Sequence, residues 1–231
     1  MDKARHADAD EKNTHEARVE LLIPIIKGWM TERSLDITSD AVQIHGGMGF
    51  IEETGAAQHY RDARILPIYE GTTAIQANDL VFRKTIRDNG AAVNSLLDDI
   101  DNEMATLANH HNTEIVKASK SIIEANNTAR KVAAHILGGA NTPRRPAASG
   151  SNYLMLLGTL CGGWLMTRSG AAAADALAKG ETGAIGNDDF MKIKLTTMQI
   201  YITHHLPKIS SLACTITDGD NPALAMQPDW L

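Results

Sequence analysis

The chain has 231 residues, and 22 Lys and Arg against 28 Asp and Glu give a formal net charge of −6, which argues against binding to the phosphate backbone of nucleic acids. With 43% hydrophobic and 22% charged residues, the chain can bury a core and is not a candidate for global disorder. Because 32 alanines accompany only 10 aromatic residues, the composition favours closely packed helices over a β-sandwich or barrel, and we expect an all-α protein.

Helical periodicity first appears near Ala17, where apolar residues begin to recur at three- and four-residue spacing. Pro24 lies inside this pattern and should kink the helix or mark its restart. Residues 36–43 form a second helical stretch that ends at a glycine pair. The next segment, 48–71, has no clear periodicity and is punctuated by glycine and proline. We therefore expect an irregular connection there, and the best place for a functional site.

The helical pattern resumes at Thr72, which we expect to be an N-cap, and runs to about Arg87. Four more helices are predicted at about 91–110, from 115 to the glycines at 138–139, at 152–178, and from an N-cap at 187 or 188 to about 218. Residues 141–150, which contain two prolines, should form an exposed, turn-rich connection. Because everything that suggests chemistry precedes Asn89, we divide the chain into two helical sections, 1–89 and 90–231.

The cysteines and the apolar runs bear on the cellular compartment of the protein. Cys161 and Cys214 are far apart and lie in apolar stretches, so they suggest neither a disulfide framework nor a metal site. The first twenty residues are mostly charged or polar, so they provide no apolar core for a secretory signal. The longest apolar run, 154–166, is shorter than the roughly 20 residues that a membrane span needs. We expect a cytoplasmic protein without a membrane partner.

Two pairs of adjacent histidines, at 110–111 and 204–205, are the candidates for metal ligands. Neighbouring residues on a helix point to different sides, and only the first pair has a carboxylate, Glu114, one turn away. Because two ligands do not make a metal site, the sequence predicts structural or solvated histidines and no bound metal.

Two segments carry the candidate chemistry. Residues 43–49, Gln-Ile-His-Gly-Gly-Met-Gly, are a helix end that runs into three glycines. Such glycines let backbone amides approach a flat or anionic group, although the residues alone favour a simple helix stop. In the second segment, 60–76, Glu70 precedes a glycine just ahead of the helix that Thr72 would cap. From spacing alone, the structural interpretation is favoured: a negative charge just before the helix interacts favourably with the helix dipole.

These segments carry a resemblance to a known family. Residues 16–84 resemble the C-terminal helical domain of flavin-dependent acyl-CoA dehydrogenases: Gln-x-x-Gly-Gly-x-Gly at 43–49, and Tyr-Arg-Asp-Ala-Arg-Ile followed by Ile-Tyr-Glu-Gly-Thr at 60–72, match in type, order and spacing. The helices expected at 152–177 and 188–213 are similar to the extra helical domain of the longer bacterial members. The resemblance implies an antiparallel helical bundle of that C-terminal type at 1–89, truncated at its start, followed by a second helical bundle at 90–231.

The resemblance also implies a reaction. The family's catalytic base falls on Glu70, which would remove the proton next to the thioester carbonyl of an acyl-CoA while a hydride passes from the β carbon to FAD. The thioester oxygen would accept a hydrogen bond from the backbone amide of Glu70. Tyr69 and Gly71 would flank the substrate. A glutamate suits this role where an apolar site raises its proton affinity.

The cofactor and partners follow from the same resemblance. FAD would contact the start of the helix after Glu70, where amides are unpaired. The glycine-rich turn would also contact FAD, in the family typically the FAD that is bound by a neighbouring subunit. The residues assigned to FAD are Gln43, Ile44, His45, Gly46, Gly47, Thr72, Thr73 and Ala74. Many members carry Asn and Gly in place of the last two. We expect a homo-oligomer, electron-transfer flavoprotein as electron acceptor, and a role in fatty acid metabolism.

The length of the chain is the main departure from the family. Its members also have an N-terminal helical domain and a middle β domain, which this sequence does not contain. We therefore expect a C-terminal fragment or split subunit that is inactive without a complementing subunit and binds FAD poorly alone. The alternative is a catalytically silent helical module that kept the motif and acts by oligomerising or by binding a partner.

Overall fold

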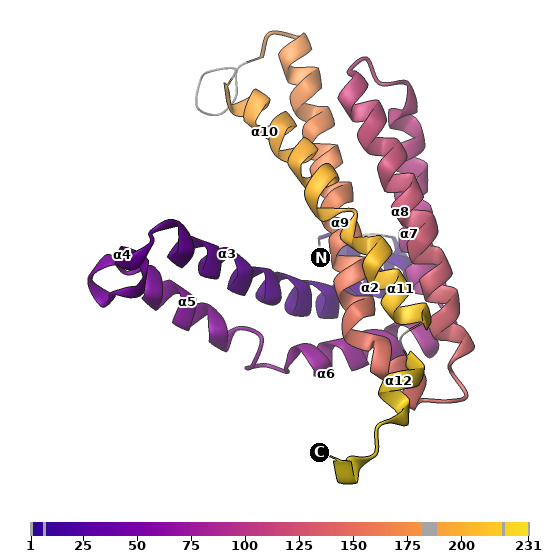
Figure 1. Cartoon of the computed structure of the whole chain (residues 1–231). Helices are drawn as coiled ribbons and strands as arrows, with labels where there is room; N and C mark the ends of the chain where they lie inside the picture. Colours follow the sequence, from indigo (N-terminus) through magenta and orange to yellow (C-terminus); the bar gives the residue numbers. More distant parts are fainter. Residues whose placement is uncertain (1, 7, 182–188, 219, 231) are drawn as a thin grey trace.

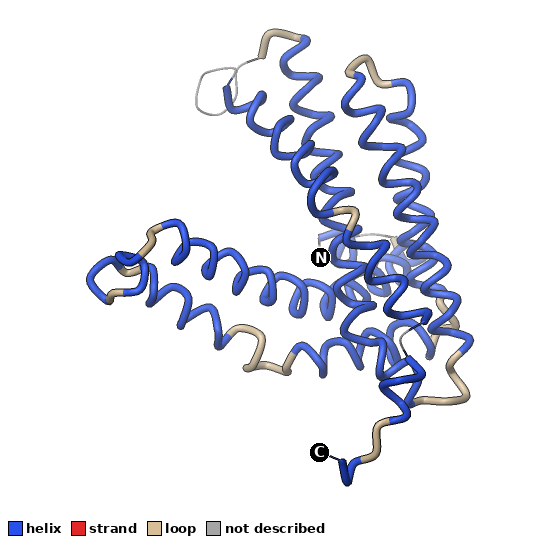
Figure 2. The backbone as a smooth tube through the Cα atoms, in the orientation of Figure 1, coloured by secondary structure: helices blue, strands red, loops and turns tan. Residues whose placement is uncertain are grey.

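The structure, a computed structural model, describes residues 2–6, 8–181, 189–218 and 220–230. Within these ranges it consists of helices and connecting turns without a strand, as Figure 2 shows. This confirms the all-α prediction. None of the described helices is both long and apolar enough to cross a membrane.

The helices follow one another through short connections. The α-helices are α1 (Asp2–His6), α2 (Ala9–Ile25), α3 (Thr31–Ile44), α4 (Gly47–Phe50), α5 (Ala56–Ile65), α6 (Thr73–Asn78), α7 (Ala91–Thr106), α8 (Thr113–Gly138), α9 (Arg144–Ala178), α10 (Asp189–Ile200), α11 (Lys208–Asp218) and α12 (Asp220–Ala225). Three π-helical segments, η1 (Ile26–Met30), η3 (Asp79–Ile86) and η5 (Tyr201–His205), continue α2, α6 and α10 directly. Short 3₁₀ turns occupy η2 (Glu52–Thr54), η4 (Leu107–Asn109) and η6 (Pro228–Trp230).

These elements form a bundle with an arm (Figure 1). Helices α7 to α11 make the upright bundle, and α3 and α5 run side by side away from its lower half, with α4 at the tip. Helix α2 lies within the bundle and passes through η1 into α3, while α6 and η3 bring the chain back. The arm is therefore connected to the bundle at both ends, through η1 on one side and α6 on the other.

The larger of two apolar core clusters among the described residues joins most of the bundle helices. Its fully buried members include Leu21 from α2, Leu80 from η3, Leu97 from α7, Ile136 from α8 and Leu156 from α9. Helices from before and after Asn89 thus bury side chains against one another.

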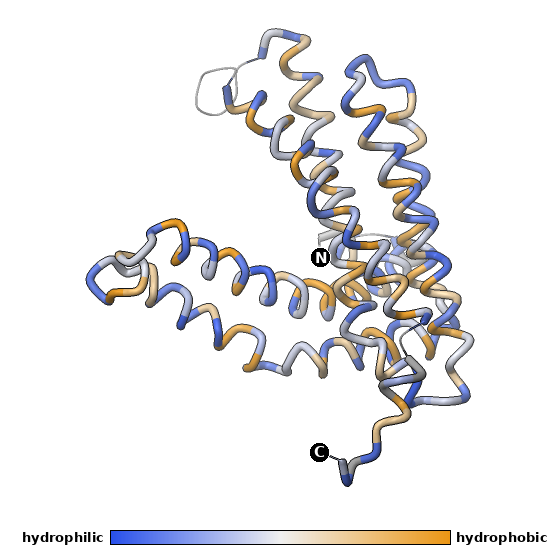
Figure 3. Tube along the Cα trace, viewed as in Figure 1, coloured by the Kyte–Doolittle hydropathy of each residue, from blue (hydrophilic) through white to orange (hydrophobic). Residues whose placement is uncertain are grey.

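The arm differs from the bundle because it has almost no interior. Helix α3 buries no residue, and α5 buries only Ala56 and Ala63. Figure 3 shows apolar residues spread along the arm nevertheless. The large apolar side chains that are exposed between residues 26 and 75 are Ile26, Met30, Ile37, Ile44, Met48, Phe50, Ile51, Tyr60, Ile65, Leu66, Ile68, Tyr69 and Ile75. Large apolar side chains left exposed in such numbers mark a place where another surface packs.

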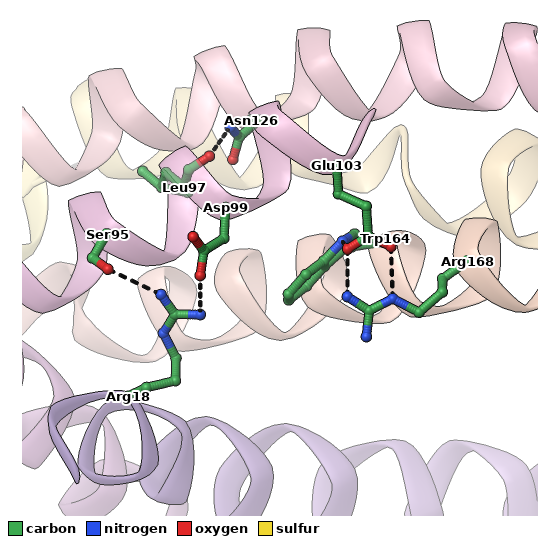
Figure 4. A network of polar contacts seen from close by, with 8 residues as sticks. All are labelled: Arg18, Ser95, Leu97, Asp99, Glu103, Asn126, Trp164 and Arg168. Carbon is green, nitrogen blue, oxygen red and sulfur yellow. Dashed lines mark hydrogen bonds and ion pairs between the residues drawn. The ribbon is translucent and has the colours of Figure 1, made fainter. Parts of the chain in front are cut away.

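Polar contacts join the bundle helices around this core (Figure 4). Arg18 of α2 donates to Ser95 Oγ over 3.1 Å and pairs with Asp99 over 2.9 Å, which ties α2 to α7. The buried Asn126 of α8 donates from Nδ2 to the carbonyl oxygen of Leu97 over 2.8 Å.

A second polar cluster ties α7 to α9. Glu103 accepts hydrogen bonds from Arg168, with 2.6 Å between Arg168 Nε and Glu103 Oε1, and from Trp164 Nε1 over 2.8 Å. The Arg168 guanidinium, helped by the Trp164 indole N–H, holds the pKa of Glu103 below its ordinary value although burial opposes this. The guanidinium also lies 4.7 Å from the Trp164 ring centre, within cation–π distance.

Three predicted connections differ from the structure. Of the two outcomes expected at Pro24, a kink or a restart, the restart is wrong, because helical structure runs without a break from Ala9 to Ile44 through η1. The segment 48–71 was expected to be irregular, but it contains α5, whose inward residues are small alanines that leave no apolar period to detect. The prediction of an exposed turn at 141–150 is also wrong from residue 144 onward. Helix α9 starts there and tolerates Pro146 in its first turn.

Other expectations hold. Thr72 is an N-cap whose Oγ1 accepts a hydrogen bond from the amide of Ile75 over 3.4 Å. The helix predicted at 91–110 is present as α7 and η4. The predicted N-cap at residues 187 or 188 lies outside the described residues.

Candidate active site

Glu70 lies in the short connection between α5 and α6, where the arm returns to the bundle. Its backbone has a φ of 57°, a left-handed conformation that residues with a Cβ seldom adopt. The next residue, Gly71, has a φ of 95°. The side chain of Gln76 supports the turn by donating from Nε2 to the carbonyl oxygen of Glu70 over 3.2 Å. Backbone strain of this kind clusters at active sites and ligand-binding turns.

The carboxylate of Glu70 forms an ion pair with a lysine. Lys27 Nζ, from η1, lies 3.2 Å from Glu70 Oε2. The Glu70 side chain is 59% exposed and that of Lys27 is 46% exposed, so this ion pair adds little to stability. Glu70 is therefore open to whatever approaches from outside the chain, with Lys27 beside it.

The start of α6 lies directly behind this turn. The hydroxyl of Thr73 donates to Glu32 Oε1 over 2.5 Å, and the Thr73 amide donates to the carbonyl oxygen of Pro67 over 3.3 Å. Ala74, one residue on, is exposed. Both polar groups of Thr73 are thus occupied within the chain, and the exposed residues at this helix start are Thr72 and Ala74.

The glycine-rich turn forms the tip of the arm. Gly46 has a φ of 59°, and a Cβ placed at Gly46 or at Gly47 would meet no atom within 4 Å. At Gly49, by contrast, a Cβ would stand 2.2 Å from the carbonyl oxygen of Val42. Gly49 is needed for the close approach of α4 to α3, whereas the first two glycines leave bare backbone that faces open space.

The residues before the glycines are also exposed. Gln43, Ile44 and His45 close α3, and Ile44 is 83% exposed. The ring of His45 lies back along the helix, with Nδ1 2.8 Å from the carbonyl oxygen of Ala41. Beside this turn is a mainly apolar groove lined by Val42, Phe50, Ile51, Glu52, Ala57, Tyr60 and Arg61.

The predicted site residues fall into two groups. Tyr69, Glu70 and Gly71 lie next to the helix start at 72–74, while residues 43–47 lie at the far end of the arm (Figure 1). The ten-residue helix α5, about 15 Å long, separates the two groups. A single copy of the chain does not bring both groups to one place.

Sequence reasoning missed the three residues that support the Glu70 turn, namely Lys27, Glu32 and Gln76. Lys27 and Glu32 precede the turn by about 40 residues, and each looks like an ordinary solvated charge on a helix. No pattern in the sequence links them to Glu70.

Comparison with protein families covers nearly the whole chain. The family described as "Acetyl-CoA dehydrogenase C-terminal like" matches residues 96–227, and the family described as "Acyl-CoA dehydrogenase, C-terminal domain" matches residues 3–84.

Individual proteins match over the same range. The chain is 41% identical over 227 residues to 3-methylmercaptopropionyl-CoA dehydrogenase of Ruegeria pomeroyi, covering 96% of the chain and 37% of that protein. It is 30% identical over 212 residues to the broad-specificity linear acyl-CoA dehydrogenase FadE5 of Mycobacterium tuberculosis, covering 90% of the chain and 34% of that protein. Over 46 residues it is 56% identical to the bovine mitochondrial short-chain specific acyl-CoA dehydrogenase, which is 20% of the chain and 11% of that protein. The chain thus spans little more than a third of the first two relatives.

Proposed function

Because the chain belongs to the acyl-CoA dehydrogenase family, we propose that it supplies the catalytic base for the α,β-dehydrogenation of an acyl-CoA thioester. Glu70 is this base. The strained, exposed turn at Glu70, with a backbone φ of 57°, is the observation that supports the role, since backbone strain of this kind clusters at active sites.

The residues around Glu70 divide the work. The Glu70 carboxylate accepts the α proton, and the backbone amide of the same residue donates a hydrogen bond to the thioester oxygen, where negative charge develops. Tyr69 and Gly71 flank the acyl group. FAD, when bound, supplies the acceptor for the hydride from the β carbon.

Two exposed segments suit FAD. Thr72, Thr73 and Ala74 open a helix whose amides can receive an anionic group, although Thr73 first has to release Glu32 or Pro67. The bare backbone of Gly46 and Gly47, with Gln43 to His45, offers a second surface to a cofactor. Because α5 keeps the two segments apart, we propose that they contact different FAD molecules and that the protein works as a homo-oligomer.

The exposed apolar side chains of the arm suggest that further domains cover it in the active enzyme. Phe50, for example, is 82% exposed and buries little of its surface within this chain. We propose that domains equivalent to the remaining two thirds of the relatives, on the same or a complementing polypeptide, cover the arm and that catalysis requires them. The family matches at 3–84 and 96–227 also support a division of the chain near Asn89.

The surroundings of the reaction are proposed from the same family membership. Electron-transfer flavoprotein is the proposed electron acceptor, and fatty acid metabolism the proposed setting. The free thiols of Cys161 and Cys214 are consistent with the reducing cytoplasm, which we propose as the location.

A chimera tests the role of Glu70. Residues 1–231 replace the aligned region of the R. pomeroyi enzyme, flavin content is measured from the visible spectrum, and exchange of the substrate α proton is followed in D₂O. We expect a yellow chimera that exchanges the proton, and loss of exchange with unchanged flavin in Glu70→Gln. The matched control is Glu53→Gln, an exposed glutamate on the arm, which should keep full exchange.

The chimera also tests the alternative. Undiminished exchange in Glu70→Gln would remove Glu70 from the mechanism. A chimera that binds flavin but exchanges no proton would instead support a catalytically silent module.

A further inference from the structure

We propose that His110, His111 and Asp175 form a binding site for Zn²⁺ at the end of the bundle remote from the arm. Among the described residues, these three make up the one group of metal-binding side chains whose ligand atoms all lie within 4.8 Å of one another. This site is independent of the proposed dehydrogenase reaction, which uses none of these residues.

The backbone explains how two adjacent histidines come to face the same way. The pair lies between η4 and α8, outside any helix, and His110 has an extended conformation with a ψ of 143°. The rings lie 4.3 Å apart with only 31° between their planes. The divergence that a helix would impose on neighbouring side chains is therefore absent at this pair.

The third ligand comes from another part of the chain. Asp175 is in the last turn of α9, about 65 residues further on. Its Oδ1 lies 3.1 Å from His110 Nε2 and 3.5 Å from His111 Nδ1. In a tetrahedral zinc site with metal–ligand bonds of about 2.0–2.1 Å, neighbouring ligand atoms are about 3.3–3.4 Å apart. The two distances to Asp175 lie on either side of this value.

The ligand set selects the kind of metal. Two imidazole nitrogens and one carboxylate oxygen suit Zn²⁺ and similar first-row divalent ions, whereas Ca²⁺ and Mg²⁺ prefer oxygen ligands alone. Three protein ligands leave a fourth position for water. His110 is well buried, while His111 and Asp175 are half exposed, so the ion can enter from solvent.

Two existing hydrogen bonds of His110 oppose metal binding, and the second also provides a spectroscopic signal. With its proton on Nε2, His110 donates to Asp175 Oδ1, and zinc would displace this bond. The backbone amide of Asn112 donates to His110 Nδ1 over 3.1 Å, which places the imidazole proton on Nε2. Zinc at Nε2 moves this proton to Nδ1, so the Asn112 amide loses its acceptor. Metal binding should therefore be of moderate affinity and should shift the amide resonance of Asn112.

Zinc at this site would tie the connection between α7 and α8 to the end of α9. The tips of these helices are at the upper end of the bundle in Figure 1. The ion would add a bond beside the small apolar cluster in which Ile115 of α8 and Ala171 and Ala174 of α9 are buried. Because zinc would bind the folded chain alone, it should raise the melting temperature.

The experiment uses the full chain without an affinity tag, titrated with ZnCl₂ and followed by calorimetry, with Co²⁺ as an optical probe of coordination. We expect one ion per chain, a tetrahedral Co²⁺ spectrum, a zinc-dependent rise in melting temperature and a shift of the Asn112 amide. Asp175→Asn and His111→Ala, which change half-exposed side chains, should each weaken zinc binding about tenfold or more.

The matched control is His204→Ala, which alters the other pair of adjacent histidines, in η5, and should leave zinc affinity unchanged. Far-UV circular dichroism verifies that each variant is folded. Absence of zinc binding by the native chain, unchanged affinity in Asp175→Asn, or equal weakening in His204→Ala would each overturn the proposal.

Discussion

The indole of Trp29 lies against the backbone of Gly158, so closely that a Cβ at residue 158 would stand 2.2 Å from Trp29 Cγ. Trp29 belongs to η1, which leads into the arm, and Gly158 is in the middle of α9. Trp29 Nε1 also donates to Thr159 Oγ1 over 3.3 Å. This contact fixes the arm to the bundle.

We predict that Gly158→Ala destabilises the protein by about 1–3 kcal/mol, because the added methyl group has no room unless the indole or α9 moves. Urea unfolding followed by circular dichroism measures the change. Gly138→Ala is the control: it lies at the end of α8, where an added Cβ meets nothing within 4 Å, and alanine's higher helix propensity should leave stability equal or slightly raised. Equal stability of the two variants would show that the contact does not constrain α9.

The cluster around Glu103 predicts a pH dependence. Because Arg168 lowers the pKa of Glu103 in the folded protein below the ordinary value of 4.5, the folded state favours the ionised form. This contribution is fully present above pH 4.5 and is lost as the pH falls through the lower pKa of the folded state.

Glu103→Gln should therefore lower the free energy of unfolding at pH 7 by about 1 kcal/mol, and its stability should fall less than that of the native protein on acidification. Unfolding curves at several pH values between 7 and 3 measure the difference. Parallel loss of stability in both proteins would contradict the prediction.

The exposed side chains of the arm predict an unusual response to mutation. Ile44→Ser combined with Phe50→Ser should reduce the binding of the dye ANS without lowering the melting temperature, because both side chains are more than 80% exposed and bury little surface within the chain. Leu80→Ala, at a fully buried core position, should instead cost about 2–5 kcal/mol. A large loss of stability in the double variant would mean that the arm folds over its own apolar residues.

The arm tip offers a test that separates folding from cofactor contact. Gly49→Ala should loosen the tip, because the new Cβ would collide with the carbonyl oxygen of Val42, and amide hydrogen exchange over residues 43–55 should rise. Gly47→Ala should leave exchange unchanged, since open space surrounds that position.

The proposed cofactor contact adds a second readout. In the chimera with the R. pomeroyi enzyme, Gly47→Ala should lower flavin content at unchanged stability if a cofactor approaches this backbone. Full flavin content would argue against contact at Gly47.

Much of this protein follows from local sequence. The helices, the cap at Thr72 and the turn at the glycines of 46–49 are set by residues that lie within a turn or two of each other. Local hydrogen bonding and steric limits act over that distance. The motif around Glu70 is equally local, and the family matches support the relationship that it suggested.

Only the tertiary structure decided which distant residues meet. Lys27 beside Glu70, Trp29 against Gly158 and Asp175 between two histidines join residues separated by tens of positions in the chain. Helix α5 could not be recognised in the sequence, because the only residues it buries are the small Ala56 and Ala63. Such contacts depend on how whole helices pack. The burial of apolar surface that drives this packing is non-directional and does not depend on how far apart two residues are in the sequence.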